Sequence, residues 1–430
     1  MSRLLSTADA RFETEFSHLL SRAVTAPQLT GAVRDILLRV QREGDEAVLD
    51  LTNRFDRVNY SLADLSVSAE EIAAAAAATP ASLRDALALA AARIEAFHRA
   101  QLPQDLAFTD TVGAELGLRW TPLDAVGIYV PGGKASYPSS VLMNAIPAKV
   151  AGVSRIAMCV PAPDGALNPL VLAAAELAGV TEIYRIGGAQ AVAALAHGTA
   201  LIQKVDKIVG PGNAYVAEAK RQVFGQVGID SMAGPSEVLI LADAENDPAH
   251  LALDLLAQAE HDEEAQALLI TNDPGLAQSV AQAVVEALQT LPRAAIAGES
   301  WRRHGGIILV RHWDEAAVLA NRIAPEHLQI MTAAPKAIFA KIRHAGAAFL
   351  GKNCPEAIGD YIAGPNHVLP TSGTARFASG LAVYDFLKRT SWVALEQGAL
   401  AAIGPAAVAL AEAESLTAHA RSVSTRLRKT

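Results

Sequence analysis

The sequence predicts an α/β protein made of two Rossmann-like (incomplete) parallel-sheet units with helical N-terminal and C-terminal extensions. From residue 125 to residue 350, short apolar runs rich in β-branched residues alternate with Ala-rich helical stretches, which is the pattern of βαβ units. Hydrophobic residues make up 51% of the chain but aromatic residues only 5%, which favours helices packed on sheets over an all-β design. At 430 residues, the chain has room for roughly two to four domains.

The first part of the chain, residues 1–110, is expected to form a helical region that packs on the α/β core. Apolar residues recur at helical spacing from residue 12 to about residue 102. The segment Ser68–Glu71 has the spacing of a capping box and precedes an alanine run. Thr79-Pro80 has the sequence of an N-cap followed by the first residue of another helix.

Residues 125–236 are predicted to form the first Rossmann-like unit, which we expect to bind a dinucleotide cofactor. Its strands are expected at Val126–Val130, Arg155–Val160, Glu182–Ile186 and Lys207–Val209, with helices at Pro169–Ala178 and Ala214–Phe224. The strands are short and rich in β-branched residues, and the helices between them are rich in alanine.

Three apolar strands of this unit end in small-residue turns that open helices. The turns are Tyr129-Val-Pro-Gly132-Gly133-Lys134, Gly187-Gly188-Ala189-Gln190 and Gly210-Pro211-Gly212-Asn213. Glycines at a helix N-terminus let backbone amides approach a phosphate, and ligands of open α/β sheets bind where strands end. The full Gly-x-Gly-x-x-Gly fingerprint is absent, and any single turn is also explained by tight chain reversal. Three successive turns favour a dinucleotide site in which Tyr129, Gln190 and Asn213 hydrogen-bond the cofactor.

Residues 237–380 are predicted to form a second Rossmann-like unit that carries the metal and catalytic residues. Its strands are expected at Glu237–Ala242, Ala265–Thr271, Gly306–Val310, His327–Met331 and Ala347–Leu350, with helices at Pro248–Ala259, Trp313–Ile323 and Pro335–His344. The segment 351–379 is too polar for a core and too long for a simple connector, so we expect it to be functional. From Leu381 to the end, residues 381–430 are expected to form a helical tail.

Glu326 and His327 stand side by side directly after Pro325. Pro325 cannot continue the preceding helix, so the pair is predicted to lie at a helix-to-strand junction, where catalytic groups are commonly presented. A carboxylate that activates water beside an imidazole that titrates near neutrality provides two bases for two successive proton removals. A chance Glu-His pair in a solvated loop is the alternative, and only partners elsewhere in the chain decide between them.

Gln258 and His261 lie three residues apart at the end of a predicted helix and therefore face the same way. Imidazole with oxygen donors suits zinc or a similar divalent ion. Asp360, in the irregular segment, and His419, in the tail, are the candidates for further ligands. Each of these residues is also explained as a surface group, and glutamine is an uncommon zinc ligand. The remaining alternatives are the neighbouring carboxylates Glu260, Asp262 and Glu263.

The formal charge of −9 argues against a nucleic-acid partner or an anionic membrane surface, because either would need a basic surface. Cys159 and Cys354 are the two cysteines and form no Cys-x-x-Cys motif, which excludes a disulfide framework and a thiolate zinc site. The N-terminus lacks a signal-peptide pattern, so a cytoplasmic enzyme is expected. A Cys354 thiolate could attack an aldehyde, but only Lys352 is placed to lower its pKa, and water activated by Glu326 is the better nucleophile.

These motifs resemble those of the histidinol dehydrogenase family along nearly the whole chain. The matching stretches are Gly127–Lys134, Val209–Val216, Asp230–Glu237, Gln258–Asp262, Ala324–Leu328 and Gly364–Arg376. The resemblance implies oxidation of L-histidinol through L-histidinaldehyde to L-histidine, with two molecules of NAD and one zinc ion (Zn2+) per site. It also implies a homodimer with shared active sites.

The resemblance also implies roles for individual residues. Glu326 and His327 would be the catalytic bases. The zinc ligands would be Gln258, His261, Asp360 and His419. NAD would contact Tyr129, Gln190 and Asn213, while Ser236, His327, Asp360 and Glu414 would join the zinc ligands in holding substrate. The alternatives are a related enzyme that oxidises another small polar alcohol and an inactive paralogue that only binds NAD or metal.

Overall fold

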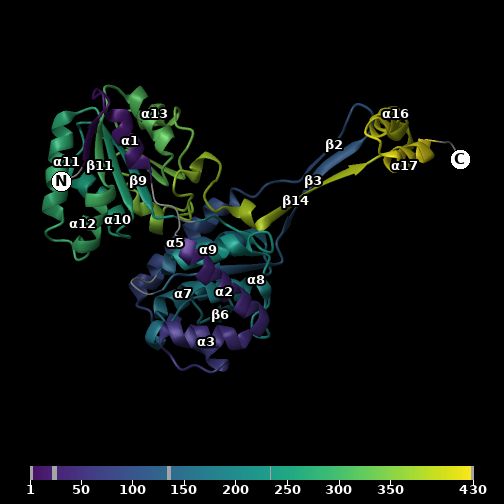
Figure 1. Ribbon diagram of the computed structural model, residues 1–430, viewed down its shortest axis with the longest axis horizontal. Coiled ribbons are helices and arrows are strands. Elements are labelled where there is room, and N and C mark those ends of the chain that lie inside the picture. The colour runs from purple at the N-terminus through teal and green to yellow at the C-terminus, as the bar shows by residue number, and fades with distance from the viewer. Residues whose placement is uncertain (1–2, 22–26, 133–136, 233, 428–430) are drawn as a thin grey trace.

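The computed structural model describes residues 3–21, 27–132, 137–232 and 234–427, which form two parallel sheets and one antiparallel sheet. Figure 1 shows two α/β bodies next to one another and an arm that projects away from them. The predicted α/β class with two parallel-sheet units is confirmed. The division of the chain into domains at residues 110, 125, 236 and 380 remains a prediction.

The six-stranded sheet has the strand order β1-β11-β10-β9-β12-β13, and every pairing is parallel. Its strands are β1 (Arg3–Ser6), β9 (Glu237–Ala242), β10 (Gln266–Thr271), β11 (Gly306–Leu309), β12 (His327–Met331) and β13 (Ala347–Leu350). Alternate residues of these strands point into two apolar cores, one on each face. One face is covered by α10 (Pro248–Ala259), α11 (Pro274–Ala287) and α12 (Ala294–His304), and the other by α1 (Phe12–Leu20), α13 (Trp313–Ile323) and α14 (Pro335–Phe339).

The strands of this sheet that follow residue 236 lie where the sequence predicts them, to within one residue. The helix predicted at Pro335–His344 is too long, because α14 ends at Phe339. The amides of residues 341 and 342 bond to carbonyls three residues back, which closes the helix in a tight turn.

The predicted helical region begins with a strand, β1, which pairs in parallel with β11 along the sheet edge. Four residues are too few to show the alternation of a strand, so only the pairing with a distant segment identifies β1. Helix α1 also packs on this sheet. The first residues of the chain therefore belong structurally to the second unit.

The five-stranded sheet has the strand order β6-β5-β4-β7-β8 and is also parallel. Its strands are β4 (Ala125–Tyr129), β5 (Arg155–Cys159), β6 (Glu182–Tyr184), β7 (Lys207–Val209) and β8 (Gly228–Ile229). One face is covered by α4 (Ala69–Ala78), α5 (Ala81–Arg99), α6 (Pro138–Ala151) and α7 (Pro169–Ala178), and the other by α2 (Pro27–Glu43), α3 (Asp45–Asp56), α8 (Gly188–His197) and α9 (Ala214–Val223). Helices from the N-terminal region thus complete both layers around this sheet.

The capping box predicted at Ser68 is confirmed. The Ser68 hydroxyl accepts the Glu71 N–H at 3.2 Å, and the Glu71 carboxylate accepts the Ser68 N–H at 2.9 Å. Thr79 is not the N-cap of α5, which is Pro80. The Thr79 hydroxyl instead donates to the carbonyl of Ala75 at 2.9 Å, so it closes α4.

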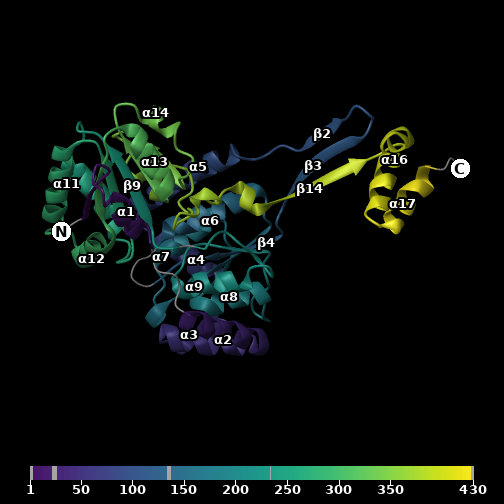
Figure 2. The ribbon, with the colours of Figure 1, turned by 45° about the horizontal axis from the view of Figure 1, so that its top comes forward.

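The arm is a three-stranded antiparallel sheet in the order β14-β3-β2, tipped by two helices (Figures 1 and 2). Its elements are β2 (Leu106–Thr109), β3 (Glu115–Pro122), β14 (Leu387–Ala394), α16 (Gln397–Ala413) and α17 (Thr417–Leu427). The prediction of helix from residue 381 onward is therefore wrong over 387–394. This segment holds Thr390, Trp392 and Val393, which favour strands, and all its residues pair with β3.

The helices at the tip of the arm have almost no buried surface of their own. Only Ala399 and Gly404 of α16 and Ala420 of α17 are buried. Leu410 is 66% exposed, although a two-helix unit normally gains its stability from packing an apolar face. Among the described residues, no helix is long and apolar enough to cross a membrane.

The remaining elements are short. They are α15 (Ala357–Tyr361) and the 3₁₀ turns η1 (Ala63–Leu65), η2 (Pro163–Gly165), η3 (Thr374–Arg376) and η4 (Val383–Phe386). Three of them, α15, η3 and η4, lie in the segment between β13 and β14, which runs past both sheets before it enters the arm.

Candidate active site and metal centre

The two parallel sheets carry their candidate site residues at opposite ends of their strands. The glycine turns of the five-stranded sheet follow the carboxyl ends of β4, β6 and β7. Glu326 and His327 lie instead at the amino end of β12 in the six-stranded sheet. The connector 230–236 leaves the carboxyl end of β8 and enters the amino end of β9. The connector therefore joins the ends of the two sheets that carry the Glu326-His327 pair and the glycine turns.

The predicted helix-to-strand junction around Pro325 is confirmed. Ala324 ends α13 in the left-handed region, with φ 52° and ψ 59°, a conformation that a non-glycine residue rarely adopts. The carbonyls of Pro325 and Glu326 then accept the N–H groups of Gly346 and Ala347, each at 2.9 Å. These bonds fix the backbone on both sides of the Glu326 side chain.

Glu326 is buried, with 6% of its surface exposed, and its carboxylate accepts the N–H of Glu237 at 2.8 Å. Burial raises the pKa of Glu326 well above that of an exposed glutamate, although the bond from Glu237 opposes the change. The neighbouring carboxyl groups of Asp360 and Glu356 raise this pKa further. Ionisation of the Glu326 carboxyl group therefore depends on positive charge nearby.

His327 is oriented by the backbone of β9. Its Nδ1 lies 3.0 Å from the carbonyl oxygen of Glu237, and because a carbonyl only accepts, Nδ1 must carry the hydrogen. The Nε2 atom therefore presents a lone pair. Burial lowers the pKa of His327 to about 4, so the ring is neutral at pH 7 and can accept a proton or bind a metal.

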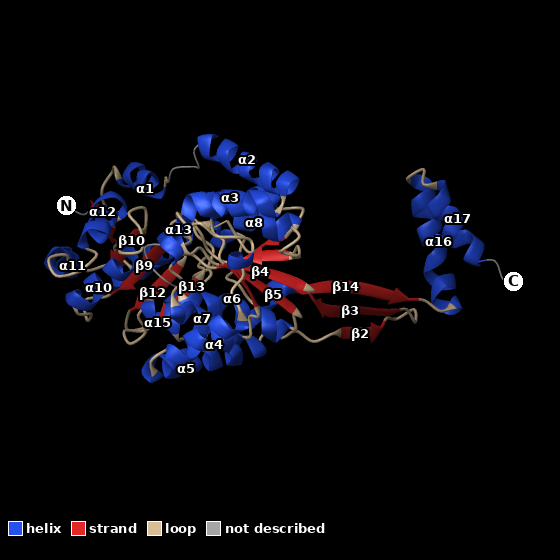
Figure 3. Cartoon of the chain, turned by 90° about the horizontal axis from the view of Figure 1, so that it is seen from below, coloured by secondary structure: helices blue, strands red, loops and turns tan. Residues whose placement is uncertain are grey.

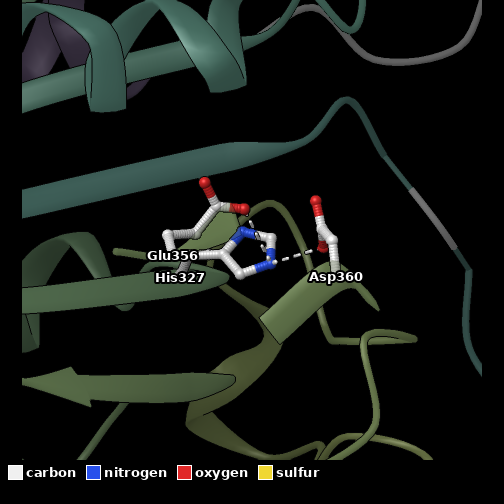
Figure 4. A group of neighbouring side chains, drawn as sticks. All are labelled: His327, Glu356 and Asp360. Atoms are coloured by element: carbon white, nitrogen blue, oxygen red, sulfur yellow. Dashed lines mark ion pairs between the residues drawn. The ribbon is translucent and has the colours of Figure 1, made fainter. Parts of the chain in front are cut away.

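Two carboxyl groups face this lone pair (Figure 4). Nε2 of His327 lies 3.7 Å from Oε1 of Glu356 and 4.0 Å from Oδ1 of Asp360. One ligand atom from each of these three residues falls within 4.8 Å of the others. Burial, with the charges of Asp360 and Asp254, raises the pKa of Glu356 to about 8. Crowded carboxyl groups of this kind favour a bound cation.

The end of α10 adds two predicted ligands. Gln258 is fully buried and its Nε2 lies 3.4 Å from Nδ1 of His261. Its Oε1 atom has no hydrogen-bond partner within the described part of the chain, and the same is true of Oε1 of Glu356. Buried polar atoms normally have partners. Together with a neutral imidazole and carboxylates, these orphaned oxygens fit a divalent cation such as zinc.

Glu356 is the residue of this cluster that the sequence analysis missed. It precedes Asp360 by one helical turn at the start of α15, a spacing that places both side chains on one face. Its N–H donates to Oε1 of Gln329 at 3.1 Å, and Nε2 of Gln329 donates to Asp254 at 2.6 Å. These two hydrogen bonds hold the backbone of Glu356 in place through the side chain of Gln329. The Glu-x-x-x-Asp spacing was the only signal available.

His367, from the irregular segment, joins the site to the other body. Its Nδ1 lies 2.9 Å from the carbonyl oxygen of Asp360, and its Nε2 lies 3.3 Å from the hydroxyl of Ser140 on α6. Burial lowers the pKa of His367. A cavity of about 260 Å³ lies against both His327 and His367 and extends to Phe97 of α5. The segment 351–379 thus supplies Glu356, Asp360 and His367 to this cluster.

The three predicted NAD contacts lie at the carboxyl edge of the five-stranded sheet or directly after it. The Tyr129 hydroxyl is buried and accepts the N–H of Gly188 at 3.1 Å, and burial raises the pKa of Tyr129 to about 12. The Asn213 side chain caps α9 by accepting from the amides of Tyr215 and Val216. Gln190 is buried, and its Oε1 has no partner among the described residues. The expected turn residues Gly133 and Lys134 lie outside the described residues.

The other predicted site residues divide into two groups. Ser236 directly precedes β9, and its carbonyl accepts the N–H of Gln266 at 2.9 Å, so it borders the catalytic edge. Glu414 follows α16 and His419 lies within α17, and both are exposed. Figure 3 shows these helices standing apart from both sheets. The structure therefore gathers the body residues and leaves the two tail residues separate.

Neither cysteine belongs to the cluster. Cys159 is buried at the end of β5, and burial raises the pKa of its thiol to about 12. Cys354 is partly buried in the turn before α15, where its N–H donates to the carbonyl of Gly351.

Comparison with known proteins identifies the family. The sequence model of histidinol dehydrogenase matches residues 20–427. The chain is 64% identical over 426 residues to histidinol dehydrogenase from Gluconobacter oxydans and 58% identical over 428 residues to that from Ruegeria pomeroyi, and each alignment covers 99% of both proteins. The crystal structure of histidinol dehydrogenase from Elizabethkingia anophelis matches with a TM-score of 0.94 at 37% identity, covering 99% of this chain and 98% of that one. The chain belongs to the histidinol dehydrogenase family.

Proposed function

We propose that this protein is a zinc- and NAD-dependent dehydrogenase that oxidises L-histidinol through L-histidinaldehyde to L-histidine. The observation that carries the proposal is the oriented, neutral imidazole of His327 beside the buried carboxyl group of Glu326. The similarity to histidinol dehydrogenases at 58–64% identity supports the substrate. The cysteine content fits a cytoplasmic enzyme.

In the first oxidation, Nε2 of His327 would take the hydroxyl proton of histidinol, and bound NAD would accept the hydride from the carbon that bears this hydroxyl. Nε2 is suited to this task because the Glu237 carbonyl fixes the hydrogen on Nδ1. The low pKa of His327 means that the ring is unprotonated before the reaction. The product of this step is the aldehyde.

In the second oxidation, Glu326 takes a proton from water as the water oxygen bonds to the aldehyde carbon. A second NAD would accept a hydride from the resulting hydrate. The hydrate also releases a proton, and the product is the carboxylic acid. The site borders a partly open cavity of about 260 Å³, and retaining the aldehyde there would protect it from side reactions.

The metal would be held by Gln258, His261, Asp360 and His419. A bound zinc ion would anchor the substrate's nitrogen atoms and supply positive charge that lowers the pKa of neighbouring carboxyl groups. The geometric cluster within one chain differs from this set, since it contains His327 and Glu356 with Asp360. We assign His327 to proton transfer because its one lone pair cannot serve both tasks, and we place Glu356 beside the ligands.

His419 and Glu414 would complete the site of a second copy of the chain. In one chain, the helices α16 and α17 at the tip of the arm lie apart from α10 and α15, which carry Gln258 and Asp360 (Figure 3). The tip also leaves apolar residues such as Leu410 exposed, and docking on a symmetric partner would bury them. The proposed active unit is therefore a homodimer with shared sites.

The product ratio tests the proposed reaction. The zinc-loaded protein should form two NADH for each histidinol consumed and release little free aldehyde. Other small amino alcohols should drive little NAD reduction. A ratio of one NADH per histidinol, with aldehyde accumulating in solution, would contradict the two-step proposal.

A further inference from the structure

Lys220 and Asp230 form an ion pair inside the five-stranded body. Their side chains are only 2% and 3% exposed. Lys220 lies in α9, and Asp230 follows β8 at the start of the connector to the other sheet. The proposed reaction uses neither residue. Burying two opposite charges costs desolvation that their attraction often fails to recover, so the pair calls for an explanation beyond stability.

Both charged groups bind the backbone of the same residue, Gly210, one at the peptide group on each side of it. The Lys220 ammonium donates to the Gly210 carbonyl at 3.0 Å, and the Asp230 carboxylate accepts the Gly210 N–H at 2.7 Å. Gly210 has a φ of 108°, and a Cβ atom there would overlap the carbonyl oxygen of Tyr129. The pair therefore fixes a glycine whose conformation other residues cannot easily adopt.

Gly210 opens the turn that ends in Asn213, the N-cap of α9. The same glycine packs directly on the backbone of Tyr129, whose hydroxyl holds the turn at Gly188. A shift of the Gly210 backbone would thus disturb the turn that Gly210 opens and the backbone of Tyr129, whose side chain holds the turn at Gly188. Bonds to charged groups are stronger and shorter than neutral ones, which suits them to holding such a turn rigid.

We propose that Lys220 and Asp230 are a positioning pair that holds the Gly210–Asn213 turn in the shape that binds NAD. The inference rests on the proposed function for the identity of the ligand. The pair acts on the binding of the dinucleotide and leaves the chemical step largely alone. The reason is that the far end of the connector is held separately, by the bond from Gly234 to Thr371 at 2.6 Å and the bond from Glu237 to Glu326 at 2.8 Å.

The test is the double variant Lys220→Met/Asp230→Asn, which removes both charges together and leaves no unpaired buried ion. The matched control is Lys207→Met/Asp385→Asn. That pair joins the opposite end of β7 to η4, with an ammonium-to-carboxylate distance of 2.9 Å. Both double variants lose one ion pair that involves a lysine of the same α/β unit, but only the first touches the Gly210 turn.

For the full-length protein, calorimetry should show NAD binding about tenfold or more weaker in the Lys220/Asp230 variant, from the loss of a charged hydrogen bond. The KM for NAD should rise with it, while the KM for histidinol and kcat stay within about twofold. Without NAD, hydrogen exchange should be faster in the peptide spanning residues 208–216. The control should match the wild type in all of these measurements.

Equal NAD binding and equal exchange in the Lys220/Asp230 variant and the wild type would overturn the inference. If the wild type bound no NAD, the proposed function would fail, while the exchange comparison would still test the positioning role. Should the double variant not fold, Asp230→Glu keeps the charge and displaces the carboxylate by one methylene. It should weaken NAD binding several-fold, and unchanged binding would again refute the role.

Discussion

The amino edge of the six-stranded sheet and the tip of the arm both carry predicted site residues, but in opposite physical states. At the sheet edge, Glu326 and His327 are 6% and 4% exposed and each is held by a bond to Glu237. At the tip, Glu414 and His419 are exposed and have no such support among the described residues. The side chains at the sheet edge are held within a single chain, whereas those at the tip would be held only in the proposed dimer.

The difference separates residues whose pKa is shifted by burial from residues whose proposed role depends only on where the arm places them. Burial sets the protonation of His327 and Glu326, because desolvation is the largest cause of both pKa shifts. Substitutions at the sheet edge should therefore impair the reaction in the subunit that carries them. Substitutions at the tip should impair the site of the partner, so an intact tip from another subunit should restore activity.

The largest effect is expected for His327→Gln. Glutamine keeps a polar group but cannot take the hydroxyl proton, and loss of a general base typically costs about 10²- to 10⁴-fold in rate. The measurement is NADH formation from histidinol at saturating substrate. His250→Gln is the matched control, because that histidine is 73% exposed on α10 and should retain full activity. Retention of more than about a tenth of wild-type activity in His327→Gln would contradict the role as base.

Mixing two inactive variants tests the proposed sharing of sites. His261→Asn damages the sheet-edge half and His419→Asn the tip half. In a mixed dimer, one site draws both intact histidines from different chains, and the other carries both lesions. Random exchange makes about half of the dimers mixed, so about a quarter of wild-type activity should return.

The subunit-exchange experiment needs proof that mixed dimers form, for example by two distinguishable tags and sequential affinity purification. Each variant incubated alone through the same exchange procedure is the control and should stay inactive. Verified mixed dimers without activity would mean that each chain builds its own site. The tip and the sheet edge would then have to meet within one chain.

Glu326→Gln should separate the two oxidations. The amide cannot take a proton from water, so oxidation of supplied histidinaldehyde should fall by about 10²-fold or more, while oxidation of histidinol to aldehyde changes less. Single-turnover measurements with each substrate give the two rates. Normal oxidation of the aldehyde by this variant would remove Glu326 from the second step.

The sequence predicted the sheet-edge region better than the arm, for a physical reason. Helix-to-strand alternation is a local pattern, so β9, β12 and β13 were located correctly. The junction at Pro325 followed from the geometry of proline alone. By contrast, β14 is exposed on most of its length and is defined by pairing with β3, whose partner residues lie far away in sequence.

The ligands show the same limit. The spacing of Gln258 and His261 indicated a shared direction, but joining them to Asp360 needed the resemblance to a family. Glu356 was missed because a single carboxylate at the start of a short helix has no pattern of its own. Its burial and its contacts with Gln329 and His327 exist only in the folded chain.

Glu356→Gln should weaken metal binding without abolishing the chemistry. Glu356 lies beside Asp360 and His327 but is placed outside the ligand set, and loss of such a supporting carboxylate typically costs about 10- to 100-fold in metal affinity. Competition with a zinc chelator measures the change. The control is Glu286→Gln, a residue on α11 in a different part of the same body. An unchanged zinc affinity would make Glu356 a purely structural group.

The smallest effect is expected for Cys354→Ala, which sharpens the boundary of the sheet-edge site. Cys354 lies only two residues before Glu356, yet its recorded backbone bond goes to Gly351 within the turn, and it is absent from the group of metal-ligating side chains. Water activated by Glu326 needs no thiol, so both oxidation rates should stay within about twofold of the wild type. The same variant should be insensitive to a thiol-alkylating reagent, because Cys159, the remaining cysteine, is fully buried. A loss of aldehyde oxidation comparable to that of Glu326→Gln would instead make the thiol the nucleophile and extend the catalytic edge into α15.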